Sequence, residues 1–228
     1  MFLCLVLAHL VADFVLQTDK ICKDKAARKW RSVYHYVHAA VVFGLSWLVT
    51  WDVDFWWCAL VIAVTHLGID VWKSYRDEIV AWFILDQVLH LGVLGCVAYV
   101  WTGCHGWDLP LVIELWYIAV SVAVVICWKP ANIFIKLMLK HYSVNMPVDN
   151  ASGFNAGALI GTIERWLILI FVCLQRYDAL GLLIAAKSII RFGDKETAKT
   201  EYVLAGTLLS IFIAVLAGML VRWGMLTD

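Results

Sequence analysis

The sequence predicts an all-α fold, a polytopic transmembrane helix bundle of about eight spans. Hydrophobic residues make up 63% of the 228-residue chain, 16% of its residues are charged, and its mean hydropathy is +0.82. Soluble domains carry about 25% charged residues, whereas apolar runs of about 20 residues match the thickness of a bilayer core. A membrane β-barrel would need alternating segments of about ten residues, and no such pattern occurs in the sequence.

Eight apolar segments of the chain are predicted to be spans. They cover residues 1–17, 32–50, 55–72, 79–101, 111–128, 157–174, 178–191 and 201–222. The first lacks a basic N-terminal region and contains His9 and Asp13, so we interpret it as a mature helix and not as a secretory signal. The seventh is short and contains Lys187, so its alternatives are a tilted, a re-entrant or a half-crossing helix.

The charges of the loops predict the orientation of the chain. Lysine and arginine gather on alternate loops, and the positive-inside rule places such loops in the cytoplasm. They are Lys20, Lys23, Lys25, Arg28, Lys29, Arg31, Lys73, Arg76, Lys129, Lys136, Lys140, Arg191, Lys195 and Lys199. The opposite loops carry only Arg176 and Arg222. Both termini are therefore predicted to lie outside.

A turn-rich stretch, NMPVDNASGFNAG, divides the chain into two predicted halves. Residues 1–128 form an N-terminal half of five helices, and residues 157–228 form a C-terminal half of three. The linker, residues 129–156, contains NIFIKLMLKHY, whose apolar residues alternate with Lys136 and Lys140. This pattern fits a cytoplasmic amphipathic helix on the inner leaflet, and a short solvated helix explains it equally well.

Three short stretches each contain a histidine and an aspartate four residues apart. They are HLVAD at 9–13, HLGID at 66–70 and DQVLH at 86–90. Residues four apart share one face of a helix, and all three pairs lie at a similar depth from the cytoplasmic ends of their spans. An aspartate at a span centre costs about 2.5–3.5 kcal/mol on insertion scales. The three carboxylates therefore require compensating partners.

A metal site explains most of this pattern. The alternative interpretation is that each pair forms local hydrogen bonds that hold helices together. Histidine and carboxylate ligands suit zinc, manganese or iron. Some subset of seven residues would bind one or two divalent ions, with zinc the leading candidate: His9, Asp13, His38, His66, Asp70, Asp86 and His90. His38 is preferred over His35 because it lies deeper in its span.

The C-terminal half carries charged residues at the same depth as these ligands. Glu164 and Arg165 lie in GTIERW, Lys187 lies in AAKSIIRF, and Arg191 lies at the boundary of its span. They form either an internal salt bridge or a site for an anionic, phosphate-bearing substrate. The predicted substrate-binding residues are Arg165, Lys187, Arg191 and Glu164, together with Gln17 and Gln87 one turn from the ligands.

The chain resembles the bacterial membrane proteins grouped as domain of unknown function 3307. The resemblance lies in HLVADFVLQT, the histidine of HAAVVFG, THLGIDVWK and FILDQVLH, and more loosely in GALIGTIERWLI, IAAKSIIRFGD and EYVLAGTLLS, so that it extends over most of the chain. It implies a multi-pass protein of the bacterial inner membrane but no particular activity. More distantly, Thr65, His66 and Asp70 resemble the THxxxD motif of membrane-bound metal-dependent hydrolases, which suggests hydrolysis by analogy.

These observations predict a membrane-embedded metal-dependent hydrolase that acts at the cytoplasmic leaflet. A metal ion would activate a water molecule, and the catalytic carboxylates would be Asp13 and Asp86, one of them as general base. The expected partners are membrane lipids, including an anionic lipid substrate, and no nucleic acid. The alternatives are a metal-ion or proton-coupled transporter or channel and a non-catalytic metal-binding scaffold.

Overall fold

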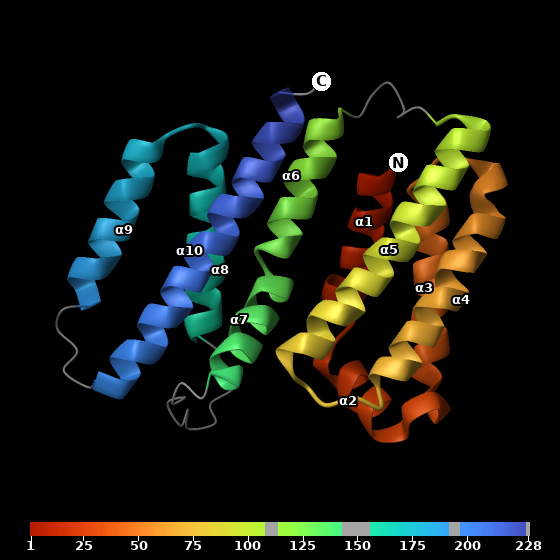
Figure 1. The fold of residues 1–228 in the computed structure, drawn as a ribbon, viewed down its shortest axis with the longest axis horizontal. Helices are drawn as coiled ribbons and strands as arrows, with labels where there is room; N and C mark the ends of the chain where they lie inside the picture. The colour runs from red at the N-terminus through yellow and green to blue at the C-terminus, as the bar shows by residue number, and fades with distance from the viewer. Residues whose placement is uncertain (108–113, 143–155, 192–196, 227–228) are drawn as a thin grey trace. The chain divides into compact units, whose positions relative to one another are not determined.

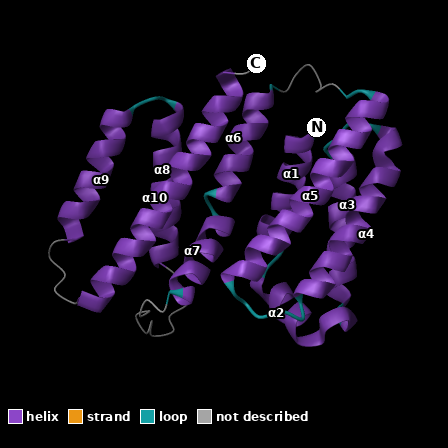
Figure 2. Cartoon of the chain, in the orientation of Figure 1, coloured by secondary structure: helices purple, strands orange, loops and turns teal. Residues whose placement is uncertain are grey.

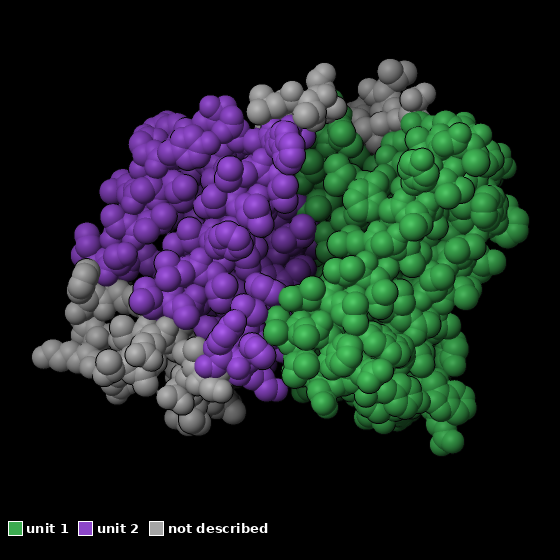
Figure 3. All heavy atoms as spheres, in the orientation of Figure 1, with its two compact units in different colours: residues 1–122 green, residues 123–228 purple. Residues whose placement is uncertain are grey.

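The computed structural model describes residues 1–107, 114–142, 156–191 and 197–226. Every regular element within these ranges is helical, and none of the described residues forms a strand (Figures 1 and 2). The prediction of an all-α fold is therefore confirmed. The chain divides into two compact units, residues 1–122 and residues 123–228 (Figure 3).

Unit 1 is a bundle of four helical segments around a shared core. The segments are α1 (Phe2–Leu10) with its continuation η1 (Val11–Leu16), α3 (Val33–Leu48), α4 (Trp56–Lys73) and α5 (Val80–His105). Helix α1 packs against α3 and α5, and α4 packs against the same two helices. Buried apolar side chains such as Leu5, Val42, Ala59, Ile62 and Leu94 fill the space between them.

The first segment of unit 1 changes geometry along its length. The α-helix gives way at Val11 to a π-helical stretch, η1, and the backbone becomes extended at Gln17. Helix α2 (Asp19–Arg28) and the short 3₁₀ helix η2 (Lys29–Arg31) then run at 89° to the first segment. π-Helical turns are rare and often occur at functional sites. Asp13, one of the predicted ligands, lies inside this one.

Unit 2 is built from α7 (Lys129–His141), α8 (Ala156–Cys173), α9 (Tyr177–Arg191) and α10 (Thr197–Leu226). Helix α10 packs against α7 and α8, and α9 packs against α8. The contact between α8 and α10 is close at Gly218, where an added Cβ would lie 2.7 Å from Cγ1 of Val172. Helix α6 (Leu115–Ile126) begins in unit 1 and ends in unit 2.

The predicted number of spans is not supported. Each of the eight predicted segments coincides with a helix, but only four stretches among the described residues are long and apolar enough to cross a membrane: Val53–Lys73, Val80–His105, Leu115–His141 and Val203–Gly224. The bent pair Phe2–Leu16 and Asp19–Arg31 would make a fifth if it forms one span.

Helix length explains the difference for α3 and α9. At 1.5 Å per residue, the 16 residues of α3 and the 15 residues of α9 rise only about 24 and 22 Å, less than the roughly 30 Å of a bilayer core. Helices α6 and α7 instead form one candidate span. The predicted linker at 129–156 begins within this candidate span, and its residues 143–155 lie outside the described residues.

The surface of the helices fits a nonpolar environment. Large apolar side chains are exposed on both units, for example Tyr99 at 83%, Leu182 at 72% and Phe212 at 65%. An apolar surface of this extent is unfavourable in water and typical of contact with lipid or with another protein. Together with the candidate spans, it supports a membrane protein.

Candidate metal centre

The helices of unit 1 bring the seven predicted ligands together. His9 lies on α1, Asp13 on η1, His38 on α3, His66 and Asp70 on α4, and Asp86 and His90 on α5. The four histidines and Asp86 are buried, and the side chains of Asp13 and Asp70 are only 10% and 13% exposed. Such a cluster of buried polar groups must find partners, because desolvated charges and dipoles are costly when they are unpaired.

Three of these residues place their ligand atoms in a small triangle. His38 Nε2 lies 3.1 Å from Asp13 Oδ1 and 3.0 Å from His66 Nε2, and His66 Nε2 lies 3.3 Å from Asp13 Oδ1. Ligand atoms around a tetrahedral zinc ion, with bonds of about 2.0–2.2 Å, lie about 3.3 Å apart. The distances among the Asp13, His38 and His66 atoms, hereafter the triad, are close to this spacing, and those of 3.0 and 3.1 Å also fit hydrogen bonds.

The triad draws on three different elements, so its geometry depends on how they pack. In η1 the π-helical turn carries Asp13 towards α3 and α4, while its oxygen Oδ1 stays 3.7 Å from Nδ1 of His9 in the preceding turn. Asp70 lies further out, with oxygens 3.9 Å from Nε2 of His38 and of His66. The triad is thus the tightest grouping, and Asp70 borders it.

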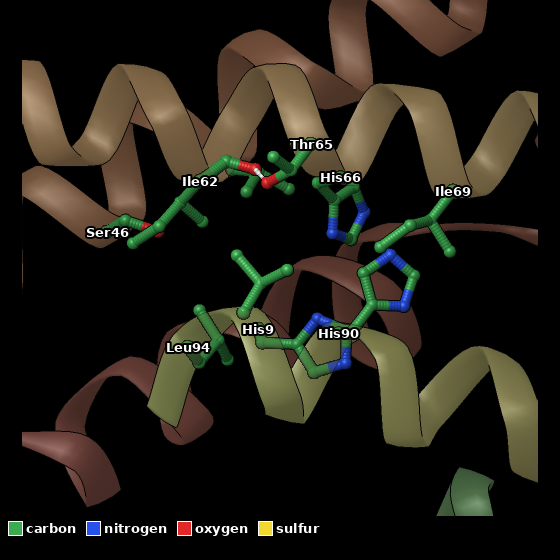
Figure 4. A pocket seen from close by; sticks show the side chains of 10 residues that line it. His9, Ser46, Ile62, Thr65, His66, Ile69, His90 and Leu94 are labelled. Carbon is green, nitrogen blue, oxygen red and sulfur yellow. Dashed lines mark hydrogen bonds between the residues drawn. The ribbon is translucent and has the colours of Figure 1, made fainter. Parts of the chain in front are cut away.

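His9, His66 and His90 line a small cavity beside the triad (Figure 4). Their rings gather at one end of it, with centroids 4.1 Å apart for His66 and His90 and 4.9 Å apart for His9 and His90. Apolar side chains, including Ile62 and Leu94, and the hydroxyl group of Ser46 line the other end. The cavity places open space next to a candidate ligand, which a catalytic metal site requires.

Two residues of the centre have buried atoms without a hydrogen-bond partner among the described residues. They are both ring nitrogens of His90 and the oxygen Oδ1 of Asp86. The closest approach between them, His90 Nδ1 to Asp86 Oδ1, is 3.7 Å and too long for a hydrogen bond. Buried polar atoms are nearly always satisfied, so these atoms are available to an ion or a water molecule.

Two lysines that the sequence argument used only to orient the chain belong to this centre. Lys25 of α2 donates to Asp70 Oδ2 at 2.6 Å, and Lys73 at the end of α4 donates to Asp86 Oδ2 at 2.5 Å. Lys25 is buried, with a relative exposure of 6%. Lys73 follows Asp70 by three residues, so helical spacing could have indicated that Lys73 lies near the centre. No sequence spacing indicates Lys25, because the bend at Gln17 decides where α2 lies.

The two predicted glutamines also contact the centre. Gln17 accepts a hydrogen bond from Lys25 at 2.7 Å. Gln87 donates to Asp86 Oδ2 at 2.9 Å, and its oxygen lies 3.3 Å from Nε2 of His9. Both amides therefore hold the charged groups and histidines in place. Their predicted contact with a substrate remains a prediction.

The structure also separates His35 from His38. His38 belongs to the triad, whereas the closest carboxylate atom to His35, Asp70 Oδ2, lies 4.0 Å from its Nδ1. His35 is fully buried, and neither ring nitrogen has a hydrogen-bond partner within the described part of the chain. The preference for His38 as a ligand stays a prediction.

The charged residues of the C-terminal half form contacts within unit 2. Buried Arg165 donates to the carbonyl oxygen of Cys127 at 2.6 Å, to Asn132 Oδ1 at 2.6 Å, to Ser210 Oγ at 2.9 Å and to Thr162 Oγ1 at 3.1 Å. These bonds join α8 to α10 and to the segment around α7.

Lys187 forms an ion pair with Glu164, and Arg191 ends α9 with a side chain outside the described part of the structure. The salt-bridge alternative for Glu164 and Lys187 is therefore the contact that the structure contains. A role of these residues in substrate binding remains a prediction.

Comparison with known proteins identifies a family for the N-terminal half. Residues 1–117 match the family model described as a protein of unknown function, DUF3307. The match includes all seven predicted ligands and both lysines, and it ends before Glu164, Arg165 and Lys187. It is thus shorter than the resemblance drawn from the sequence, which extended into the C-terminal half. Neither a curated protein nor a solved structure matches the chain.

Proposed function

Because the chain belongs to the DUF3307 family of proteins of unknown function, we propose its function from the geometry of its metal centre: a membrane-embedded, metal-dependent hydrolase. The observation that carries the proposal is the triad, whose three ligand atoms lie 3.0 to 3.3 Å apart. Zinc is the leading candidate for the ion, and manganese or iron are the alternatives, since these metals accept mixed histidine and carboxylate ligands.

The chemistry of a hydrolase fits the groups around the triad. A divalent ion bound there would lower the pKa of a water molecule and polarise a phosphoryl or acyl oxygen. Asp13 would act as a ligand, and Asp86 would act as general base. The free oxygen Oδ1 of Asp86 could accept a hydrogen bond from water, while Lys73 and Gln87 hold its other oxygen, Oδ2.

The position of the centre within unit 1 supports a class of substrate. Helix α2 lies at one end of unit 1 (Figure 1), and Lys25 of α2 and Lys73 at the end of α4 contact the carboxylates of the centre. Because basic loops are retained on the cytoplasmic side, we propose that this end faces the cytoplasm of a bacterial inner membrane. Both termini lie outside if the number of spans is even. We propose an anionic, phosphate-bearing lipid of the cytoplasmic leaflet as substrate, with Lys187, Arg165 and Arg191 as the predicted contacts to its head group.

Metal content and lipid turnover test this proposal together. Full-length protein purified in detergent should retain zinc, manganese or iron by elemental analysis, and His66→Ala with Asp70→Ala should not. Mass spectrometry of phospholipids and polyprenyl phosphates should show metal-dependent product formation, which Asp86→Asn abolishes. Folded wild-type protein that retains no metal would reject the metal centre itself.

A proton-coupled or metal-ion transporter is the second candidate, and one observation favours it. The rings of His38, His66, His90 and His9 follow one another with centroid distances of 5.0, 4.1 and 4.9 Å. Such chains of ionisable groups also form relay paths in membranes. In that case lipids would stay intact, and proteoliposomes would show an ion flux that depends on His9, Asp13 and Asp86.

A further inference from the structure

We infer that the centre holds one divalent ion and not two, because the ammonium groups of Lys25 and Lys73 take the place of a second cation. The inference rests on the proposed metal centre and specifies how many ions it binds. It also assigns the ion to Asp13, and it gives Lys25 and Lys73 the role of positioning residues that keep Asp70 and Asp86 away from metal.

Asp70 and Asp86, the two carboxylates outside the triad, each have an ammonium partner. Lys25 Nζ lies 2.6 Å from Asp70 Oδ2, and Lys73 Nζ lies 2.5 Å from Asp86 Oδ2. Asp13 differs from both. Among the described residues, its charged neighbours within 4.0 Å are histidines, and no lysine or arginine approaches it that closely. Asp13 is therefore the carboxylate whose charge remains for a metal ion to compensate.

The charges of the centre balance with a single ion. The carboxylates of Asp13, Asp70 and Asp86 contribute three negative charges, and the two lysines contribute two positive charges. One divalent ion then leaves one positive charge, which a hydroxide or an anionic oxygen of a substrate would neutralise. Two divalent ions would leave three positive charges at a buried site, where the repulsion between them is weakly screened.

Lys25 also occupies a carboxylate that a second ion would need. His66, Asp70 and His90 form a further group whose ligand atoms all lie within 4.8 Å of one another. Asp70 in this group is held by Lys25, which is itself fixed by its hydrogen bond to Gln17 at 2.7 Å. Because Nε2 of His66 already belongs to the triad, removing the charge of Lys25 should free Asp70 to bind a second ion together with His90.

Zinc stoichiometry of the full-length protein in detergent tests the inference. The protein is saturated with zinc, freed of loosely bound metal on a desalting column, and analysed for zinc per chain. We expect one ion for wild type and a twofold increase for Lys25→Met. The double variant Lys25→Met with Asp70→Asn should return to one ion. Lys29→Met is the matched control, because Lys29 donates to the backbone carbonyl of Ser74 and not to a carboxylate, and it should bind one ion.

The outcomes separate this inference from the proposed function. Two ions in wild type, or one ion in folded Lys25→Met, would overturn the inference and leave a metal-dependent hydrolase intact. No ion in wild type would overturn the metal centre and the inference with it. If Lys25→Met does not fold, Lys25→Gln provides the same test, because it also removes the charge and keeps a polar side chain beside Asp70.

Discussion

At the scale of single residues, the structure divides the predicted ligands by what each one contacts. Asp13, His38 and His66 have the spacing of metal ligands, Asp70 and Asp86 are held by lysines, and His9 and His90 border the cavity. The sequence could place all of them on the same side of the bundle, because residues four apart share a helix face. It could not rank them, because differences of 1 Å between ligand atoms depend on the packing of four segments.

The two histidines of α3 provide a matched pair for testing the triad. His38→Gln should reduce zinc affinity by more than the 10- to 100-fold that is typical of residues that only orient ligands, because it removes a ligand atom. His35→Gln should leave zinc content unchanged, since His35 lies outside the triad. Zinc titration of both variants, with thermal unfolding to verify folding, measures this difference. Equal loss of zinc in both would contradict the assignment of His38.

Arg165 tests whether the C-terminal charges support structure or bind substrate. Arg165→Met leaves the partner atoms of Cys127, Asn132 and Ser210 without their donor in a buried site. We expect unit 2 to lose about 3 kcal/mol or more of its free energy of unfolding, since each unsatisfied buried group costs about 1–3 kcal/mol. Thermal unfolding in detergent measures the loss, and zinc content should stay unchanged. Unchanged unfolding together with lost lipid turnover would instead support substrate binding.

At the scale of helices, the local sequence pattern predicts where helices form, whereas packing decides how they bend and join. The eight predicted segments all coincide with helices, because long apolar runs leave few other ways to satisfy the backbone in a membrane. The predicted number of spans is not supported, because apolarity does not reveal where a helix ends. The π-helical turn at Val11–Leu16, the bend at Gln17 and the union of α6 with α7 had no signal in composition.

The contact of α8 with α10 depends on one glycine, and its replacement gives a test at this scale. An alanine at Gly218 would place its Cβ 2.7 Å from Val172 Cγ1 and 2.8 Å from Val172 Cβ. The helices would have to separate, and we expect a loss of about 1–3 kcal/mol, as for overpacked cores. Gly181→Ala is the control, because no heavy atom lies within 4 Å of its added Cβ. Thermal unfolding that is equally unaffected by both changes would show that the helices do not pack this closely.

At the scale of the whole molecule, the centre lies entirely within unit 1. The family match covers residues 1–117, which include every residue of the centre, whereas the cations of the C-terminal half lie in unit 2. All residues of the candidate metal centre therefore belong to unit 1. A contribution of unit 2 to substrate binding remains a prediction from charge alone.

The orientation of the chain can be tested independently of any activity. Single cysteines introduced at 18–31 should react with membrane-impermeant maleimide only from the cytoplasmic side, because the positive-inside rule retains basic loops there. Cysteines near the N-terminus should react from the opposite side. Labelling of 18–31 from outside would place the centre at the outer leaflet and would change the class of accessible lipids.

The sequence by itself determined that this protein is helical, that it is suited to a membrane, and that histidines and aspartates share helix faces at one depth. Composition and a period of 3.6 residues suffice for these conclusions, because they are properties of each segment alone. Only the tertiary structure decided that Asp13, His38 and His66 form the triad and that Lys25 and Lys73 pair with Asp70 and Asp86. The reason is physical: those contacts join separate helices, and the approach of one helix to another depends on the bend, the π-helical turn and the packing of side chains between them.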